Sequence, residues 1–453
     1  MPRLFDTQSS EIVEIVPSTE GKFSMYVCGP TVYDEPHLGH GRFTLVYDIL
    51  RRYLKYRGIE VRFVSNITDV DDKIITRAAE LGISAGELAK RYEEVWWDLM
   101  ERLGVDKPDE TPHATDWIAQ MLEMVTEMVS TGVAYETTDG VYLEVAKVDG
   151  YGLLARQNLA DLRSGARVEV DEQKKSPLDF ALWKRTPENE WGWESQFGFG
   201  RPGWHTECVA MALGILGEGF DLHGGGMDLA FPHHENERAQ AIAMGKNFAR
   251  HWMHNGFVMV GDEKMSKSLG NFTTLKDLLD STDPRAYRLL VARSHYRSPL
   301  EVTTEILQDA ARSLERIDAF ARRFADVVLQ RPEVAPSKDV IDGFNNAMDE
   351  DLNSPVGLSY VFEAITRANF ALDRAQSEEA VSNAKAALLL LATLGIVVQD
   401  RLEVPQEVIA LAEQRKVARS ERDFAAADRF RDEILQLGYV VEDSDLGFRF
   451  RKA

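Results

Sequence analysis

The pattern of apolar and polar positions near the start of the chain predicts a strand–helix–strand unit. Residues 22–29 are a short, mainly apolar stretch that ends in a glycine, as buried strands often do. Over residues 40–57 the apolar side chains recur at helical spacing, and Gly58 stands where a helix C-cap glycine belongs. Residues 59–67 return to the pattern of a strand. Units of this kind build parallel sheets whose ligands bind at the carboxyl ends of the strands.

The pattern changes character farther along the chain. Residues 75–135 have helical periodicity, whereas residues 136–200 mix short strands with glycine- and tryptophan-rich loops. After Tyr296 the pattern is almost entirely helical. We therefore predict an α/β fold with a Rossmann-like parallel-sheet domain that carries an insertion, followed by mostly α-helical C-terminal domains. The predicted domains are residues 1–295, with the insertion at about 100–200 and a signature loop at 264–268, a helical bundle at 296–400, and a small C-terminal domain at 401–453.

Length and charge narrow the possible classes of protein. A chain of 453 residues is too long for one compact core, which agrees with several domains. The start of the chain lacks the basic and apolar segments of a signal peptide, and the longest apolar run, residues 386–398, is shorter than a membrane span of roughly 20 residues. We therefore expect a cytoplasmic protein that does not bind membranes. The net charge of −22 argues against non-specific adhesion to nucleic acid, but local basic patches can still bind phosphates.

Two short segments have the chemistry of a nucleotide-binding site. His37, Gly39 and His40 lie at the predicted start of the first helix, where free N–H groups and the helix dipole favour anionic phosphates. Lys264 and Lys267 follow another predicted strand, and two cations there suit the charge of an adenylation transition state. Either segment alone would more often be an ordinary surface turn or loop. Their occurrence together and in this order favours a site that binds ATP.

The only two cysteines of the chain lie near other potential metal ligands. Cys28 ends the first predicted strand, and Cys208 lies in a segment rich in polar residues. His233 and Glu237 are spaced to project from one face of a helix, for which Pro232 is a suitable first residue. Thiolate, imidazole and carboxylate are all ligands of zinc, and a disulfide is not expected in a cytosolic protein. Each cysteine alone would more readily be a buried, inert thiol, so the residues by themselves leave both interpretations open.

Longer motifs run along essentially the whole chain. They are residues 28–34, 37–40, 66–73, 200–205, 223–237, 264–271, 294–298, 351–355 and 423–428. Together they resemble the motifs of the cysteinyl-tRNA synthetases, a family of class I aminoacyl-tRNA synthetases. The segments that contain the potential metal ligands are the most specific part of this resemblance, and the helical region around 310–400 is the least specific.

The resemblance implies an ATP-dependent ligase that forms cysteinyl-adenylate and transfers cysteine to the 3′ end of tRNA(Cys). It also implies one zinc ion per chain and Mg²⁺ bound with ATP. A zinc–sulfur bond would select cysteine more strongly than packing alone, which distinguishes a methyl-sized difference by only about 1–3 kcal/mol. By the same resemblance, the zinc ligands are Cys28, Cys208, His233 and Glu237, and the cysteine pocket contains Gly29, Thr68, Trp204 and His223. The resemblance also implies that the catalytic residues are His37, His40, Lys264 and Lys267. The implied ATP-binding residues are His37, Gly39, His40, Asp228 and Lys267.

Basic residues near the C-terminus are the predicted contact with tRNA. Arg415, Lys416, Arg419 and Arg422 gather on a predicted helix of an otherwise acidic chain. Composition alone leaves a solvated helix face equally open, and the resemblance to an anticodon-binding end favours RNA.

Two other functions remain as alternatives. One is the related ligase that joins cysteine to glucosaminyl-inositol in mycothiol synthesis, for which a tRNA-binding end would have no use. The other is a non-catalytic RNA-binding paralogue, against which the intact histidines and lysines of the nucleotide site argue. No obligate protein partner is evident from the sequence.

Overall fold

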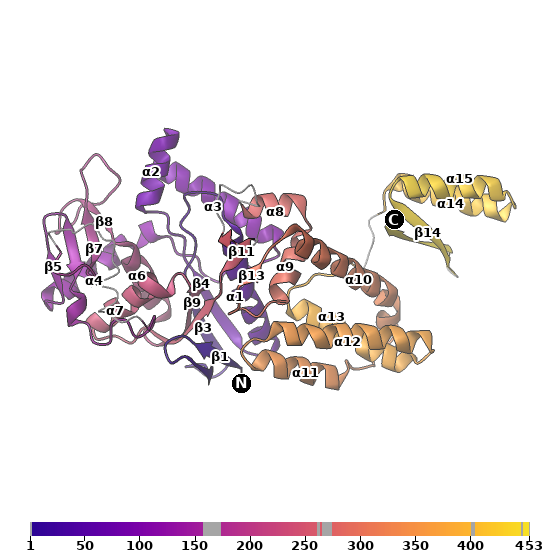
Figure 1. Cartoon of the computed structure of the whole chain (residues 1–453), viewed down its shortest axis with the longest axis horizontal. Helices are drawn as coiled ribbons and strands as arrows, with labels where there is room; N and C mark the ends of the chain where they lie inside the picture. The colour runs from indigo at the N-terminus through magenta and orange to yellow at the C-terminus, as the bar shows by residue number, and fades with distance from the viewer. Residues whose placement is uncertain are drawn as a thin grey trace. The chain divides into compact units, whose positions relative to one another are not determined.

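The computed structural model describes residues 2–156, 174–260, 263–264, 274–399, 404–444 and 447–452 (Figure 1). The chain forms two compact units, of which the larger consists of residues 1–315 and 333–397 and the smaller of residues 316–332 and 398–453. The larger unit contains the predicted metal ligands, and the smaller unit contains the basic residues near the C-terminus.

A parallel sheet lies at the centre of the larger unit (Figure 1). In spatial order it consists of β10 (Ala249–Asn255), β9 (Phe220–Gly226), β3 (Lys22–Val27) and β4 (Glu60–Ser65). Helix α1 (Leu38–Tyr56) connects β3 to β4, so the predicted strand–helix–strand unit is confirmed. The chain later returns to β9, on the opposite side of β3. The carboxyl ends of β3 and β9 therefore form the topological switch point, where sheets of this type bind ligands.

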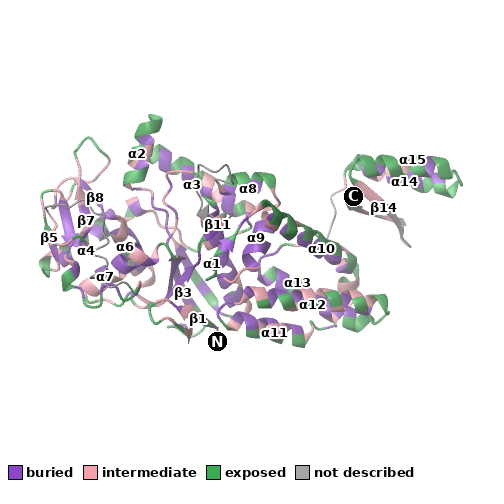
Figure 2. Ribbon diagram, viewed as in Figure 1, coloured by how far each residue is buried: buried purple, intermediate pink, exposed green. Residues whose placement is uncertain are grey.

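Burial explains why α1 forms against this sheet. The helix has an almost continuous buried face, and Gly58 follows its end with a φ of 79°, a conformation that glycine adopts without strain. β3 is buried on both faces from Met25 onward, as a central parallel strand should be. Figure 2 shows α1 and β3 as mostly buried, whereas α2 (Asp72–Leu81) has a largely exposed surface.

A second sheet, which is antiparallel, lies between β4 and β9 in the sequence. The stripe of Met121, Met124 and Met128 is buried on α4 (Ile118–Ser130) and packs in the same core as Trp183 of this sheet. The strands of this antiparallel sheet are, in spatial order, β5 (Ala134–Glu136), β6 (Gly140–Leu143), β7 (Phe180–Arg185) and β8 (Gly200–Pro202).

The helical prediction for residues 75–135 is wrong in two segments, residues 105–113 and the end of the range, where β5 begins at Ala134. Helix α3 (Ala85–Arg102) ends before Gly104, which has a φ of 67°. Residues 105–113 then run beside β4, where Val64 pairs with Glu110. Pairing with the strand and prolines that cannot continue a helix explain the break.

The helix that carries Glu237 does not begin at Pro232, where the sequence predicts its start. Helix α6 (Trp204–Leu216) precedes β9, and helix α7 (Glu235–Ala243) follows it. The chain enters α7 through the η3 turn (Ala230–His234), in which Phe231 has an extended backbone, so Pro232 is not the first residue of α7. His233 and Glu237 still face each other, because η3 leads directly into α7.

The remaining elements are mostly helical, as predicted. A short sheet contains β11 (Val258–Val260), β12 (Glu263–Lys264) and β13 (Leu300–Glu301), and β1 (Arg3–Asp6) pairs with β2 (Glu11–Glu14). The helices of this part are α8 (Leu275–Ser281), α9 (Pro284–Ala292), α10 (Thr304–Leu329), α11 (Lys338–Asp349), α12 (Ser354–Asp373) and α13 (Ser377–Thr393). The C-terminal part contains α14 (Gln406–Ser420), α15 (Phe424–Gln436) and the hairpin of β14 (Tyr439–Ser444) and β15 (Gly447–Lys452). Within the described ranges, every helix is too short or too polar for a membrane crossing.

Candidate active site and metal centre

Four potential metal ligands from separate parts of the chain meet at the switch point between β3 and β9. Cys28 directly follows β3, and Cys208 lies on α6. His233 and Glu237 come from the η3 turn and from α7. One ligand atom of each residue lies within 4.8 Å of those of the other three, and all four residues are buried. The structure therefore brings together the four residues that the sequence resemblance groups.

The distances in this cluster suit ligands that share one ion. Cys28 Sγ lies 3.7 Å from Cys208 Sγ, which is too far for a disulfide, and 3.4 Å from Glu237 Oε1. Because Zn–S bonds are about 2.3 Å long and Zn–O bonds are slightly shorter, ligand atoms around a tetrahedral zinc lie roughly 3.5 Å apart. His233 Nε2 lies closer to the carboxylate, 2.7 Å from Glu237 Oε1.

Two buried atoms of the cluster have no hydrogen bond of good geometry. They are His233 Nε2 and Glu237 Oε2. His233 Nε2 lies 2.7 Å from Glu237 Oε1, and Glu237 Oε2 lies 2.7 Å from His223 Nε2. These atoms are therefore close together without being aligned for hydrogen bonds, an arrangement that suits ligands around an ion. The other ring nitrogen of His233, Nδ1, lies 2.9 Å from Nδ1 of His205, and this contact orients the ring so that Nε2 is directed at the cluster. The donor set and the close approach of its atoms therefore fit a metal ion.

Burial and charge set the protonation of the cluster. Burial alone would raise the pKa of Glu237, but His223 and His233 hold it well below the usual value. Burial opposes a charge on His233, but attraction to Glu237 raises its pKa to about 10. Burial raises the pKa of the Cys28 thiol, whereas the hydrogen bond from Cys28 lowers the pKa of Cys208. A bound metal ion would replace these protons, because thiolate and neutral imidazole are the forms that bind.

A second set of ligands overlaps the first. Cys28, His223, His234 and Glu237 also have ligand atoms within 4.8 Å of one another, and all are buried. His223 Nε2 lies 2.7 Å from Glu237 Oε2, and His234 Nδ1 lies 2.8 Å from Nε2 of His254. The structure thus places His223, a predicted residue of the cysteine pocket, in direct contact with the cluster of candidate metal ligands.

The other three residues of the predicted cysteine pocket surround the same cluster. The Gly29 N–H donates to Asn66 Oδ1 at 2.9 Å, and a Cβ at Gly29 would lie 1.6 Å from the Asn66 carbonyl oxygen, so only glycine fits. The buried Thr68 hydroxyl accepts a hydrogen bond of 3.0 Å from Asn66 Nδ2. The Trp204 ring stacks on His233 with a centroid distance of 4.0 Å. Their contact with cysteine stays a prediction.

His37 and His40 form the start of α1, as predicted. Their rings stack at a centroid distance of 3.8 Å, and the His37 main-chain N–H donates to His40 Nδ1 at 3.1 Å. The ring proton of a neutral His40 must therefore be on Nε2, where it can be donated to a ligand. A Cβ at Gly39 would lie 2.9 Å from Cε1 of His37, so the missing side chain makes room for the folded-back ring.

The electrostatic surroundings keep both imidazoles neutral near pH 7. Burial lowers the pKa of His37 although the residue as a whole is exposed, and the nearby Asp228 opposes this effect. Burial, followed by repulsion from His37 and Lys73, lowers the pKa of His40 well below its usual value. Asp228 is exposed just beyond β9, so it lies on the same side of the switch point as the two histidines.

The two predicted lysines are described to different extents. Lys264 is the last residue of β12, and its backbone pairs with Met259 of β11. Lys267 lies outside the described residues.

Three polar residues of the site were not identified by the sequence analysis. Asn66 joins Gly29 to Thr68, and His205 orients His233. The buried Arg42 of α1 donates to the carbonyl of Phe257 at 2.6 Å, next to β11. His205 could have been found, because it is three residues before Cys208 on one helix face. Arg42 gives no such signal, since a lone arginine in an amphipathic helix normally faces water.

The C-terminal unit contains the two helices predicted there, α14 and α15, with the break at Arg422. Asp423 caps α15 through a hydrogen bond of 3.0 Å from the Ala426 N–H. Arg415 is buried, whereas Lys416, Arg419 and Arg422 are exposed. The accessible basic surface of α14 therefore comes from the latter three residues, and their contact with tRNA stays a prediction.

Comparison with known proteins assigns this fold and site to a class of enzymes. The family described as tRNA synthetases class I (C) catalytic domain matches residues 14–312. The DALR domain matches residues 343–399, and the cysteinyl-tRNA ligase anticodon binding domain matches residues 401–451. The solved structure of Mycobacterium tuberculosis methionyl-tRNA synthetase with methionyl-adenylate shares the fold, with a TM-score of 0.64 and 16% identity over 90% of this chain and 96% of that chain. The chain is therefore a class I aminoacyl-tRNA synthetase.

Similarity to curated relatives identifies the family within this class. The cysteine–tRNA ligase of Geobacillus thermodenitrificans is 42% identical over 461 residues, which cover 99% of each chain. The cysteine–tRNA ligase of Thermodesulfovibrio yellowstonii is 41% identical over 476 residues, which cover 97% of each chain. The chain belongs to the cysteine–tRNA ligase family.

Proposed function

We propose that the chain is a cytoplasmic cysteine–tRNA ligase that activates cysteine with ATP and transfers it to the 3′ end of tRNA(Cys). The observation that carries this proposal is the buried cluster of two cysteines, a histidine and a glutamate at the switch point of a class I catalytic domain. We further propose that this cluster holds one zinc ion and that ATP binds together with Mg²⁺.

The proposed zinc ligands are Cys28, Cys208, His233 and Glu237. When bound, zinc would supply a Lewis acid that holds the thiol of the substrate as a thiolate. The stacking of Trp204 on His233 keeps that side of the pocket rigid. Serine has only a hard hydroxyl and alanine has no ligand atom, so this pocket would reject both without a second, hydrolytic site.

The residues at the start of α1 have a defined part in the proposed activation step. In this step the carboxylate of cysteine attacks the α-phosphorus of ATP, and pyrophosphate leaves. His37 and His40 are neutral N–H donors at the positive end of α1, so they can stabilise charge that develops on the phosphate oxygens. Lys264 and Lys267 are proposed to do the same at the leaving pyrophosphate, and Asp228 to contact the nucleotide. No protein nucleophile is involved, so positioning and electrostatic stabilisation must supply the rate.

The second step transfers cysteine to RNA. A ribose hydroxyl of the terminal adenosine attacks the carbonyl carbon of the adenylate, and AMP leaves. We propose that residues 1–295 perform both steps, that residues 296–400 form a helical bundle, and that residues 401–453 bind the anticodon end. The match of the anticodon binding domain over residues 401–451 supports this division.

The alternative acceptor, glucosaminyl-inositol, is not favoured. An anticodon-binding domain would be useless to an enzyme that charges a sugar, and the relatives named cysteine–tRNA ligase match over nearly their whole length.

The proposal is tested by measuring cysteine-dependent ATP–pyrophosphate exchange and then charging of total tRNA and of glucosaminyl-inositol in parallel. We expect exchange and charging of tRNA only. Exchange with charging of the sugar alone would replace the function but keep the activation site. No exchange by protein that contains a full equivalent of zinc would contradict the proposal.

A double variant tests the two histidines of α1. His37→Ala with His40→Ala is expected to lower the rate of exchange at least 100-fold while cysteine binding changes less than threefold, because the histidines act on phosphate. His251→Ala on β10 is a matched control that should leave both unchanged. An equal loss of exchange and of cysteine binding would count against the assigned role.

A further inference from the structure

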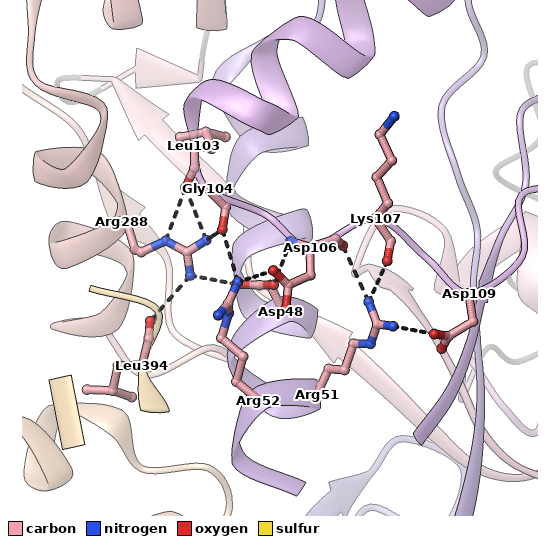
Figure 3. A network of polar contacts seen from close by, with 10 residues as sticks. All are labelled: Asp48, Arg51, Arg52, Leu103, Gly104, Asp106, Lys107, Asp109, Arg288 and Leu394. Atoms are coloured by element: carbon pink, nitrogen blue, oxygen red, sulfur yellow. Dashed lines mark hydrogen bonds and ion pairs between the residues drawn. The ribbon is translucent and has the colours of Figure 1, made fainter. Parts of the chain in front are cut away.

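A completely buried arginine joins three other segments of the larger unit (Figure 3). Arg288 lies on α9 and is 1% exposed. Its Nη1 donates to Asp48 Oδ2 at 2.6 Å and to the carbonyl of Leu394 at 3.3 Å. Its Nη2 donates to the carbonyls of Leu103 at 3.0 Å and Gly104 at 2.7 Å, and its Nε donates to Leu103 at 3.1 Å. All three nitrogens of the guanidinium are therefore used.

The carbonyls that surround Arg288 belong to two helix ends. Leu103 is the C-cap of α3, and Leu394 is the C-cap of α13. Carbonyls at such ends have no partner within the helix and carry partial negative charge, which favours a cation. Asp48 of α1 supplies the full counter-charge and is itself buried. A lysine could not make these contacts, because its single ammonium lacks the planar fork of arginine.

Asp48 is fixed from other directions as well. Its Oδ2 also accepts from Arg52 Nε at 2.8 Å, and its Oδ1 accepts from the Asp106 N–H at 3.1 Å. Figure 3 shows these groups converging between α1, α9 and the end of α3. A network in which every group is satisfied is rigid and holds its elements in one arrangement.

The backbone that follows α13 packs directly on this guanidinium. We call residues 394–397 the exit segment, because they are the last residues of the larger unit before the chain enters the smaller one for the second time, the first entry being within α10. A Cβ at Gly395 would lie 2.2 Å from Arg288 Nη1, so the main chain touches the arginine there. One turn earlier on α9, Arg285 Nη1 donates to the carbonyl of Val397 at 3.0 Å. Two arginines of α9 thus hold both ends of the exit segment.

We propose that Arg288 is a positioning residue for tRNA charging, and that it acts by fixing the exit segment to α1. This inference rests on the proposed function. The segment leads to the anticodon binding domain, which begins at residue 401, whereas α1 begins at His37 in the activation site. A fixed attachment point at this connection helps a tRNA that is held at its anticodon end to reach the activation site correctly. A misplacement of about 1 Å can lower the rate of a reaction 100-fold.

The proposal separates the two steps of the reaction. Activation needs only cysteine and ATP, so it does not depend on where the exit segment lies. Charging of full-length tRNA does depend on it. Charging of a minihelix, an RNA that has the acceptor stem but no anticodon arm, should again be independent of it.

The main test is Arg288→Lys in the full-length protein. We expect pyrophosphate exchange within twofold of wild type, a loss of at least tenfold in kcat/KM for full-length tRNA(Cys), and minihelix charging within twofold of wild type. Arg51→Lys is the matched control. Arg51 is also buried and donates to the carbonyl of Lys107 at 2.6 Å and to Asp109 at 2.6 Å. Within the described part of the chain, its hydrogen bonds do not reach the exit segment. Arg51→Lys should change all three activities alike.

A second variant covers the case in which Arg288→Lys does not fold. Arg285→Ala removes the contact with Val397 and leaves no buried charge, because Arg285 is only half-buried. We expect a loss of about threefold for full-length tRNA and none for the minihelix or for exchange.

The outcomes distinguish this inference from the function on which it rests. If the wild-type protein charges tRNA(Cys) and both α9 variants charge it normally, only the inference is overturned. It is also overturned if exchange, minihelix charging and full-length charging fall together, because Arg288 would then have a purely structural role. If the wild-type protein does not charge tRNA(Cys), the proposed function fails as well.

Discussion

At the scale of single residues, Glu237 lies at the centre of the cluster of candidate metal ligands. His233 Nε2 and His223 Nε2 each lie 2.7 Å from one of its oxygens, and Cys28 Sγ lies 3.4 Å from Oε1. The carboxylate has these close contacts with two imidazoles, whereas the two thiols can share the buried site with a carboxylate only if they stay protonated or bind a cation. A divalent cation would attract the carboxylate and both thiolates at once, which is why the cluster fits a metal ion better than a set of internal hydrogen bonds.

The contact between His205 and His233 predicts an effect on metal affinity. His205→Phe keeps a ring against Phe180 but removes the partner of His233 Nδ1. Loss of such an orienting partner typically weakens metal binding 10- to 100-fold, and we expect a decrease of about that size. Competition with a chromophoric chelator measures it, with His251→Phe as the control. Unchanged affinity in His205→Phe would show that His205 does not orient the ligand.

His40 predicts a pH dependence of stability. Because its pKa is lowered in the folded protein, the unfolded chain binds the proton more readily, near its ordinary pKa of about 6.5. Stability is therefore lost as the pH falls below about 6.5, and the contribution of His40 is fully recovered above it. We expect wild type to lose about 1 kcal/mol more than His40→Gln between pH 7.5 and 5.5. Urea unfolding at the two pH values measures this difference, and equal losses would contradict it.

Residues with motif-like neighbours could be predicted from the sequence, and isolated ones could not. Cys28 and Cys208 stand among specific motifs, so their grouping with His233 and Glu237 was predicted and is present. Arg288 gives no comparable signal. Its burial depends on carbonyls at the ends of two distant helices, which no local pattern reveals.

At the scale of elements, the close approach between the end of β3 and the segment after β4 shapes the pocket. The two strands pair in register up to Val27 and Ser65, and Gly29 then lies against the backbone of Asn66. Thr31 and Thr68 continue the contact as an isolated bridge. The pocket wall is thus an extension of the central sheet, which makes it rigid.

This contact predicts the effect of a single methyl group. Gly29→Ala would place Cβ 1.6 Å from the Asn66 carbonyl oxygen, so the two strand ends must separate. We expect a loss of about 3 kcal/mol or more in the free energy of unfolding, and loss of cysteine-dependent exchange. Gly86→Ala near the start of α3 is the matched control, because its Cβ would have nothing within 4 Å and alanine favours a helix. A mild effect of Gly29→Ala would mean that the strand ends are not held together this tightly.

Helices and strands with a regular spacing of apolar residues could be predicted, and those that depend on tertiary contacts could not. α1 and β4 follow directly from the apolar pattern of residues 40–67. The helical prediction fails at residues 105–113 because Pro108 and Pro112 cannot continue a helix and because the segment pairs with β4, a strand that is distant in the sequence. The start of α7 was misplaced at Pro232 for a similar reason, since the η3 turn that carries His233 has no local signature.

At the scale of the whole molecule, a net charge of −22 must be reconciled with binding of a polyanion. Long-range attraction cannot bring tRNA to such a chain, so local cations must provide the contact with phosphates. Lys416, Arg419 and Arg422 are exposed together near the end of α14, and they belong to the segment matched by the anticodon binding domain. Activation of cysteine, in contrast, involves no RNA.

This difference predicts that salt affects charging of tRNA much more strongly than it affects pyrophosphate exchange. The KM for tRNA should rise steeply with salt, whereas exchange should change little. Replacing Lys416, Arg419 and Arg422 together by alanine should decrease the slope of log KM against log salt concentration by about 3, or roughly 1 for each cation. The matched control replaces Arg62, Lys338 and Arg367 of the larger unit, which are exposed or half-buried and are each paired with an acidic residue. If the control decreases the slope equally, the effect comes from net charge and not from a footprint on α14. If only the α14 variant does so, the tRNA phosphates lie on that helix, and an acidic protein binds RNA through a small, local basic surface.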